Sequence, residues 1–104
     1  MAKFFKVATI QEIPLGTSKL IEKEGRIFSV YHLKEGWFAL DDRCPHRSGP
    51  LGEGTVSEGV VTCPWHGAQI ELSTGKCLHP ENLATVRVYP LRLVGDSIEI
   101  ELPI

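Results

Sequence analysis

The sequence TCPWH, residues 62–66, holds a cysteine and a histidine three positions apart, Cys63 and His66. Pro64 and Gly67 beside them favour a tight turn, because proline restricts its own backbone and glycine tolerates turn conformations. A thiol and an imidazole are both side chains that bind metal ions in proteins. This turn is therefore half of a predicted metal site.

A second turn of the same kind lies upstream in DDRCPHRSG, residues 41–49, where Cys44 and His46 are two positions apart. Residues 47–62 separate the two pairs. Four ligands from two loops, with one thiol and one imidazole in each, predict one shared metal centre. The two pairs together decide the interpretation of the chain.

Three kinds of site use these four side chains. Zinc fingers usually place both cysteines in the first pair and both histidines in the second, which differs from the order here. A Cys44–Cys63 disulfide would leave the two histidines without a role. The mixed pairs instead favour a two-iron centre, in which one iron takes both cysteines and the other takes both histidines.

The composition limits the class of protein. A chain of 104 residues has room for one domain, which we expect to span residues 1–104. The formal net charge is −2 and there is no basic run, which argues against nucleic acid or an anionic membrane as a partner. The sequence has no apolar stretch of membrane-spanning length, and its three cysteines are too few for a disulfide scaffold. We therefore expect a cytoplasmic protein.

Short strands between glycine-containing turns predict an all-β fold, either a sandwich or a small barrel. The clearest strand is SIEIEL, residues 97–102, in which isoleucine and leucine alternate with glutamate. Further strands are expected at FFKVA, RIFSVYHL, WFALD, VVTC, AQIEL and TVRVYPLRLV. Two-residue hairpin loops are expected at Glu24-Gly25, Glu35-Gly36 and Gly95-Asp96.

Two places depart from regular strands. The hydrophobic phase of TVRVYPLRLV changes at Pro90, which predicts a bulge or bend on an edge strand. In TIQEIP, Thr9 and Glu12 form a helix-capping pattern, and Pro14 ends the helix after about one turn.

Residues 41–80 differ from the rest of the chain. They contain all three cysteines, three of the four histidines, six of the ten glycines and four of the seven prolines. This composition is typical of loops. We expect this segment to bind the metal centre and the remaining strands to serve as its scaffold.

With these residues, the chain resembles the Rieske-type [2Fe–2S] proteins, in which two histidines replace two cysteines on one iron. The resemblance covers nearly the whole chain, including the STGKC turn at residues 73–77 and the final hairpin. It implies a Rieske-like β sandwich or small barrel with an inserted cluster-binding subdomain of two loops. It also implies that Cys44 and Cys63 hold the inner iron, and that His46 and His66 hold the outer iron through Nδ1.

The chain departs from the high-potential members of that family. Those members carry an extra cysteine in each loop and hydroxyl donors after the second histidine. Here the second loop has Trp65 in place of the cysteine, and the donor positions are Ala68 and Ile70. Because hydrogen bonds to the sulfurs favour the reduced cluster, their loss predicts a low reduction potential, about −150 mV.

The resemblance is strongest to the Rieske ferredoxins of ring-hydroxylating dioxygenases. It implies a soluble one-electron carrier that passes electrons from a flavin reductase to a terminal oxygenase, and we expect a monomer. The alternative is the small Rieske-like subunit of an assimilatory NAD(P)H nitrite reductase, and a non-redox interaction module is a third class. Once the ligands are assigned, only His32 and His79 remain for a mononuclear iron, so we do not expect an enzyme.

Three further residues have more than one interpretation. Trp65 is either a contact for a redox partner or a shield of the cluster from water. Trp37 is expected in the core. Cys77 is expected to be a buried thiol and not a fifth ligand.

The remaining histidines and two aspartates are expected to be structural. We predict that His32 is hydrogen-bonded within its strand region and that His79 is solvated in a surface loop. Asp41 and Asp42 are expected to cap the turn into the first ligand loop.

Overall fold

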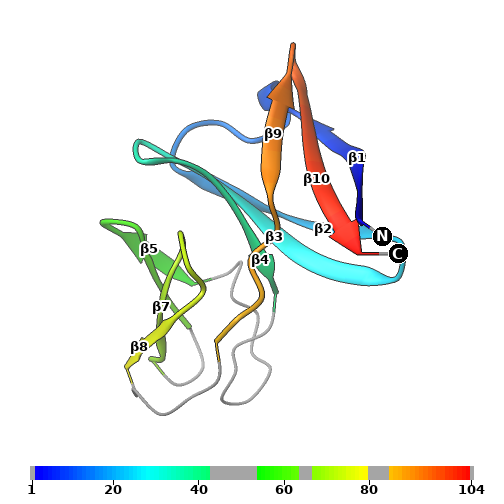
Figure 1. Cartoon of the computed structure of the whole chain (residues 1–104). Coiled ribbons are helices and arrows are strands. Elements are labelled where there is room, and N and C mark those ends of the chain that lie inside the picture. The colour runs from blue at the N-terminus through cyan, green and yellow to red at the C-terminus, as the bar shows by residue number, and fades with distance from the viewer. Residues whose placement is uncertain (1, 43–53, 64–66, 80–84, 104) are drawn as a thin grey trace.

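A computed structural model of the chain describes residues 2–42, 54–63, 67–79 and 85–103, which form three antiparallel sheets (Figure 1). The terminal sheet has the order β1-β10-β9, the middle sheet β2-β3-β4 and the small sheet β5-β6-β7-β8. The elements are β1 (Ala2–Thr9), η1 (Ile10–Glu12), β2 (Thr17–Lys23), β3 (Arg26–Leu33), β4 (Gly36–Asp41), β5 (Thr55–Ser57), β6 (Val60–Thr62), β7 (Gln69–Glu71), β8 (Cys77–His79), β9 (Leu91–Val94) and β10 (Ser97–Pro103). The all-β prediction is confirmed.

The middle sheet supplies side chains to two cores, one on each face. In β3, Phe28 and Val30 pack with the side chains of the terminal sheet, whereas Tyr31 packs with those of the small sheet. The same alternation occurs in β4, where Ala39 joins the first group and Leu40 the second. Because successive residues of a strand point to opposite faces, one strand can support both neighbouring layers.

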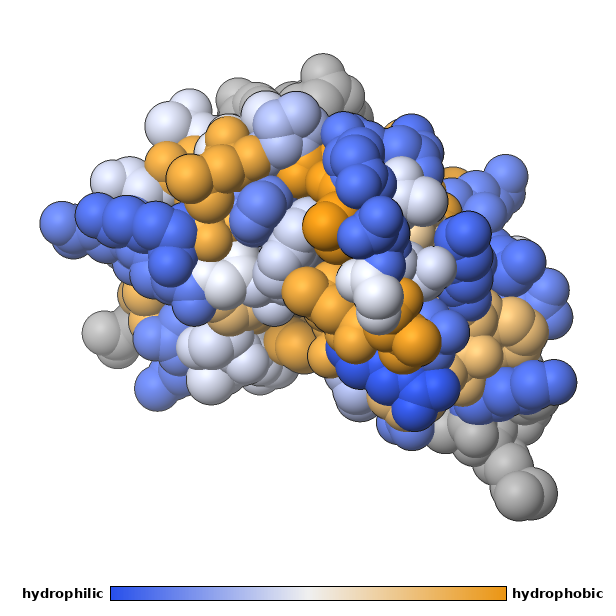
Figure 2. All heavy atoms as spheres, turned by 90° about the horizontal axis from the view of Figure 1, so that it is seen from above, coloured by the Kyte–Doolittle hydropathy of each residue, from blue (hydrophilic) through white to orange (hydrophobic). Residues whose placement is uncertain are grey.

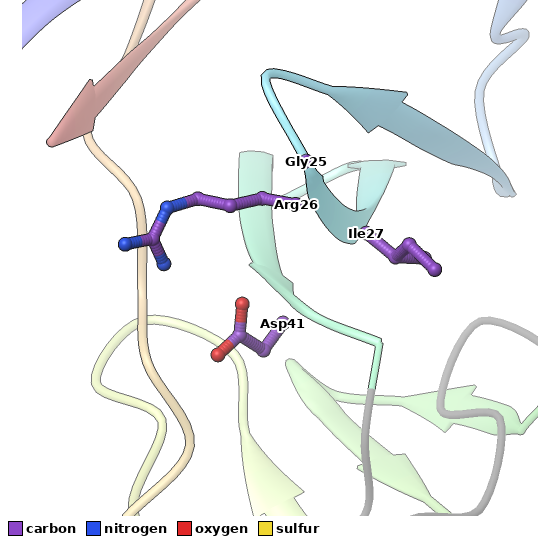
Figure 3. A pocket seen from close by; sticks show the side chains of 4 residues that line it. All are labelled: Gly25, Arg26, Ile27 and Asp41. Atoms are coloured by element: carbon purple, nitrogen blue, oxygen red, sulfur yellow. The ribbon is translucent and has the colours of Figure 1, made fainter. Parts of the chain in front are cut away.

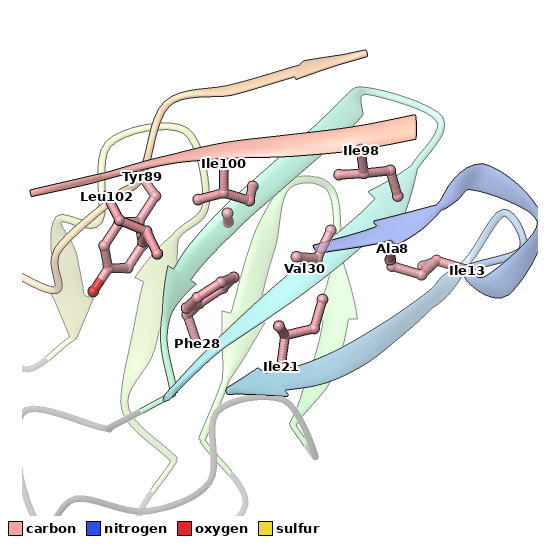
Figure 4. Close-up of a cluster of buried hydrophobic side chains, with 10 residues drawn as sticks. Ala8, Ile13, Ile21, Phe28, Val30, Tyr89, Ile98, Ile100 and Leu102 are labelled. Atoms are coloured by element: carbon pink, nitrogen blue, oxygen red, sulfur yellow. The ribbon is translucent and has the colours of Figure 1, made fainter. Parts of the chain in front are cut away.

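The first core lies between the terminal and middle sheets (Figure 4). Strand β10 contributes Ile98, Ile100 and Leu102, all fully buried, which confirms the alternation predicted for SIEIEL. Opposite them lie Ile21, Phe28 and Val30 of the middle sheet, with Ala8, Ile13 and Tyr89 at the ends. Each large side chain buried in this way contributes roughly 1.5–3 kcal/mol to folding.

The second core lies between the middle and small sheets. Tyr31 and Leu40 pack there with buried side chains of the small sheet and its turns, which are Val61, Cys63, Ala68, Ile70, Leu72, Cys77 and Val86. All of these residues are at most 5% exposed. This core therefore attaches the segment with the predicted ligands to the rest of the protein.

Two of the three predicted hairpin loops are confirmed, at Glu24-Gly25 and Gly95-Asp96. The third prediction, Glu35-Gly36, was wrong by one residue: the loop is Lys34-Glu35, because Gly36 already pairs with Leu33 as the first residue of β4. A further two-residue turn, Glu58-Gly59, joins β5 to β6. Its positive backbone φ angles, 51° and 77°, are nearly equal to those of the Glu24-Gly25 turn, 53° and 76°.

The two predicted irregularities are present. The stretch TVRVYPLRLV divides into an isolated bridge from Val88 to Leu40 and the edge strand β9, with Pro90 between them. The single helical turn η1 begins after Thr9, whose backbone N–H donates to Glu12 Oε2 at 2.8 Å. The Lys19 ammonium and the Thr9 donors lower the pKa of Glu12 to about 2.

Residues 85–90, here called the connecting segment, are bonded to all three sheets. Val86 N–H donates to Gly75 O in the turn between β7 and β8, and Tyr89 N–H donates to Ala39 O of β4. Pro90 O accepts from Glu101 N–H of β10. This short extended stretch therefore fixes the positions of the sheets relative to one another.

The surface mixes polar and apolar side chains. Figure 2 shows apolar groups interrupted by hydrophilic ones over the face seen from above. Among the described residues, the exposed large apolar side chains are Leu15, Leu20, Ile27, Leu78, Leu93 and Val94. Within the described ranges, the structure contains no helix with the length and hydrophobicity needed to cross a membrane.

Gly75 should be one of the least replaceable residues of the fold. Its φ is +76°, and a Cβ at this position would lie 1.9 Å from Val86 O and 2.9 Å from Val88 Cγ2. We predict that Gly75→Ala lowers the free energy of unfolding by about 3 kcal/mol or more, since a backbone clash adds to the left-handed strain. Chemical denaturation followed by circular dichroism measures this change.

Gly25→Ala is the matched control. Gly25 has the same φ, +76°, but no atom lies within 4 Å of its added Cβ. This variant should lose only about 1–2 kcal/mol, the cost of the left-handed backbone alone. Equal losses in the two variants would contradict the close packing of Gly75 against the connecting segment.

Candidate metal centre

Cys63 directly follows β6 and continues the hairpin that β6 forms with β7. Its N–H donates to Ala68 O at 2.7 Å, and its carbonyl accepts from Gly67 N–H at 3.0 Å. Since Thr62 pairs with Gln69, the next pair along the hairpin is Cys63 with Ala68. Directly opposed residues place their side chains on the same face of a hairpin. Both side chains are buried, at 2% and 1% exposure.

The two predicted ligand loops are attached at the same end of the small sheet. Thr55 of β5 pairs with Thr62 of β6. Gly54, which precedes β5, therefore lies across from Cys63, which follows β6. The other predicted ligands, Cys44, His46 and His66, and also Trp65, lie outside the described residues.

The surroundings of Cys63 fit an iron–sulfur cluster. The thiol lies in the second core, away from water, where a thiolate needs a metal to balance its charge. On the same face, Ala68 and Ile70 are buried and carry no hydrogen-bond donor in their side chains. In the part of the chain that the structure describes, no three His, Cys, Asp or Glu side chains gather as a metal site. The other three predicted ligands belong to loop residues outside these ranges, so the shared site stays a prediction of the sequence.

The carboxylates of Asp41 and Asp42 both have partners in the scaffold. The Asp41 carboxylate accepts a hydrogen bond from Tyr89 Oη, and the Asp42 carboxylate accepts one from Ser29 Oγ. Asp42 N–H also donates to Ile27 O at 3.3 Å. The turn that the two aspartates are predicted to cap lies outside the described residues, so the capping stays a prediction.

The hydroxyl of Tyr89 is held in its neutral, donating form. Burial raises the pKa of Tyr89, and the hydrogen bond to Asp41 adds to the effect. Arg26 Nη1 lies 3.4 Å from the same hydroxyl and acts in the opposite direction. Burial likewise raises the pKa of Tyr31, whose Oη has no hydrogen-bond partner among the described residues.

The structure places the remaining residues with predicted roles in or beside strands of the scaffold. Cys77 is buried opposite Ile70, as predicted for a structural thiol. His32 is structural as predicted, because its Nδ1 lies 2.8 Å from Ile13 O and its ring stacks on Trp37 at 3.8 Å. Trp37 is only partly buried at the edge of the first core. His79 is exposed as predicted, but it lies in β8 and not in a loop.

Comparison with known families decides the classification. The model of the Rieske [2Fe-2S] domain matches residues 3–90. The chain belongs to this family. As a Rieske protein it carries a [2Fe–2S] cluster, and the burial of Cys63 agrees with a ligand of that cluster.

Curated relatives of this Rieske protein include ferredoxin components of dioxygenases. The ferredoxin subunit of 3-phenylpropionate/cinnamic acid dioxygenase from Photorhabdus laumondii is 33% identical over 101 residues. The alignment covers 96% of this chain and 94% of that subunit. This Rieske protein is therefore an electron-transfer component and not the catalytic enzyme of such a system.

Solved structures agree on the fold. The ferredoxin of carbazole 1,9a-dioxygenase from Nocardioides aromaticivorans superimposes with a TM-score of 0.86 and 22% identity over 93% of this chain and 95% of that one. A putative NADH-dependent nitrite reductase small subunit from Mycobacterium tuberculosis gives 0.89 and 18% identity, over 100% and 98% of the two chains. At these identities the likeness concerns the fold alone, so it does not separate the two functions.

Adding a hydrogen-bond donor opposite Cys63 should raise the reduction potential of the cluster. In Ala68→Ser the new hydroxyl lies beside the Cys63 sulfur, and a hydrogen bond to it favours the more negative, reduced state. We predict a rise of roughly 40 mV in a redox titration, which corresponds to about 1 kcal/mol for one electron.

Val61→Thr is the control, because it adds a hydroxyl on the same buried face, two residue pairs away from the Cys63–Ala68 pair. It should change the potential much less. An unchanged potential in Ala68→Ser, with the variant folded, would contradict the placement of the Cys63 sulfur.

Proposed function

We propose that this Rieske protein is a one-electron carrier that accepts electrons from a flavin reductase and delivers them to a terminal oxygenase. The observation that carries the proposal is its 33% identity, over almost the whole length of both chains, to a dioxygenase ferredoxin subunit. The chain also contains the ligand motif that such a carrier needs, which is Cys44 and His46 followed by Cys63 and His66. We further propose that it works in the cytoplasm as a monomer, which suits a carrier that must release each partner.

In this proposal the four motif residues divide between the two irons. Cys44 and Cys63 hold the inner iron, and His46 and His66 hold the outer iron, where partners approach. The bound cluster supplies a reversible one-electron couple. We also propose that residues 1–104 act as one domain in which residues 41–80 bind the cluster.

The charges of the ligands explain why such a carrier accepts electrons at a moderate potential. Two ferric ions, two sulfides and two thiolates sum to zero, and one electron brings the site to −1. Four thiolates would take it from −2 to −3, which disfavours reduction further. The neutral imidazoles of His46 and His66 therefore raise the potential above that of a four-cysteine site. The apolar side chains of Ala68 and Ile70 keep it at the low end of the Rieske range.

A nitrite reductase small subunit is the second candidate. The fold is compatible with it, since the mycobacterial structure covers the whole chain. The four predicted ligands favour the ferredoxin, because they equip this chain for electron transfer by itself. The partner protein distinguishes the two functions.

A reconstituted electron-transfer chain tests the proposal. Purified protein is mixed with NADH and with the flavin reductase and terminal oxygenase encoded nearest to its gene. We expect oxygen uptake that requires this protein, and at least a tenfold loss when Cys63→Ser replaces it, since a predicted ligand is removed. If the neighbouring gene product is a sirohaem enzyme and nitrite-dependent NAD(P)H oxidation requires this protein, the second candidate is correct.

The reduction potential should fall as the pH rises through the alkaline range. The imidazole N–H groups of His46 and His66 should release protons more readily on the oxidised centre, so that reduction is accompanied by proton uptake. Protein-film voltammetry at a series of pH values measures this slope. A potential that stays flat up to the most alkaline pH at which the protein remains folded would count against histidine ligation.

A further inference from the structure

The place where the first ligand loop leaves the scaffold is held by side chains outside the ligand motif. Strand β4 ends at Asp41, three residues before Cys44. Asp41 N–H donates to Arg87 O at 3.0 Å, and Leu40 forms a bridge with Val88. The connecting segment therefore runs along the end of β4, up to the start of the loop.

The side chain of Tyr89 adds a hydrogen bond at the end of β4. Its ring is buried in the first core and lies against Phe28, with centroids 5.2 Å apart, and its hydroxyl donates to the Asp41 carboxylate. Arg26 Nη1 lies 3.4 Å from that hydroxyl. Figure 3 shows the side chains of Arg26 and Asp41, which extend from β3 and β4. Both residues line a cavity with a volume of about 210 Å³. A hydrogen bond from a neutral donor to a carboxylate is stronger than one between neutral groups.

The other end of the connecting segment is bonded to the sheet that carries Cys63. Val86 N–H donates to Gly75 O at 2.7 Å, in the turn between β7 and β8. High-potential relatives tie their two loops together with a disulfide, for which this chain lacks the two extra cysteines. In this chain the segment between Val86 and Tyr89 links the end of β4, where the first loop starts, to the small sheet, whose β6–β7 hairpin carries Cys63, without a covalent bond.

We propose that Tyr89 is a positioning residue of the electron-transfer site: its hydroxyl holds Asp41 and so fixes where the Cys44–His46 loop starts relative to the hairpin with Cys63. The bond also draws the negative charge of Asp41 toward Tyr89 and Arg26. This inference rests on the ligand assignment proposed above. It assigns a role in tuning the site to a residue outside the ligand motif.

Tyr89→Phe tests the role of the hydroxyl, because it keeps the buried ring and removes only the donor. We expect a folded protein with a lower reduction potential, since the Asp41 charge loses its donor and opposes the added electron. We also expect a broader EPR signal of the reduced protein and faster release of iron to a chelator. Asp41→Asn, which removes the charge but keeps the acceptor oxygen, should raise the potential.

Ile98→Val is the control for a purely structural effect, because it weakens the same core at the end away from Tyr89 (Figure 4). It should lower the melting temperature and leave the potential and the EPR linewidth unchanged. Unchanged potential and EPR signal in Tyr89→Phe would overturn the inference, as would a change of the same size in Ile98→Val. If Tyr89→Phe does not fold, an unchanged potential in Asp41→Asn overturns it instead. Absence of histidine-ligated iron in the unmodified protein would contradict the ligand assignment itself.

Discussion

The contact between the connecting segment and its neighbours on both sides is the constraint on which the rest of the structure depends. Gly75 approaches Val86 so closely that no side chain fits between them, and residues 87–89 are bonded along the end of β4. These contacts fix the small sheet against the middle sheet. Because the first predicted ligand loop starts beside this junction and the second belongs to the small sheet, the scaffold relates the starting points of the two loops before any metal ligand is considered.

The first core mainly stabilises the fold, whereas the second core also surrounds the predicted ligand Cys63. The first core, between the terminal and middle sheets, consists of aliphatic and aromatic side chains and contains none of the predicted ligands among the described residues. The second core buries Cys63 and Cys77 with aliphatic residues and Tyr31. An apolar, closed environment around a thiolate ligand excludes water and disfavours added negative charge. The same packing that attaches the small sheet therefore also favours a low reduction potential.

Much of the fold could be predicted from the sequence where a strand has one buried face. SIEIEL and RIFSVYHL became β10 and β3, because their patterns match strands in contact with a core. Strand β2 was expected only as one side of the Glu24-Gly25 hairpin, since most of it is exposed. Strands β5 and β8 were not predicted, because TVS and CLH show no clear strand pattern of their own. The ligand motif was visible because its residues are close in sequence. The bonds of Asp41 to Tyr89 and of Asp42 to Ser29 were not, because they join residues 48 and 13 positions apart.

The central claim is that two histidines and two cysteines hold the cluster, and the nitrogen couplings in the EPR spectrum test it most directly. The protein is purified without oxygen and reduced with dithionite, and pulsed EPR is recorded at low temperature. The account predicts an unpaired electron strongly coupled to two nitrogen nuclei, one from each of His46 and His66, and loss of one coupling in His46→Ala or His66→Ala. A reduced [2Fe–2S] signal without strong nitrogen coupling, or intact protein that binds no iron, would contradict it.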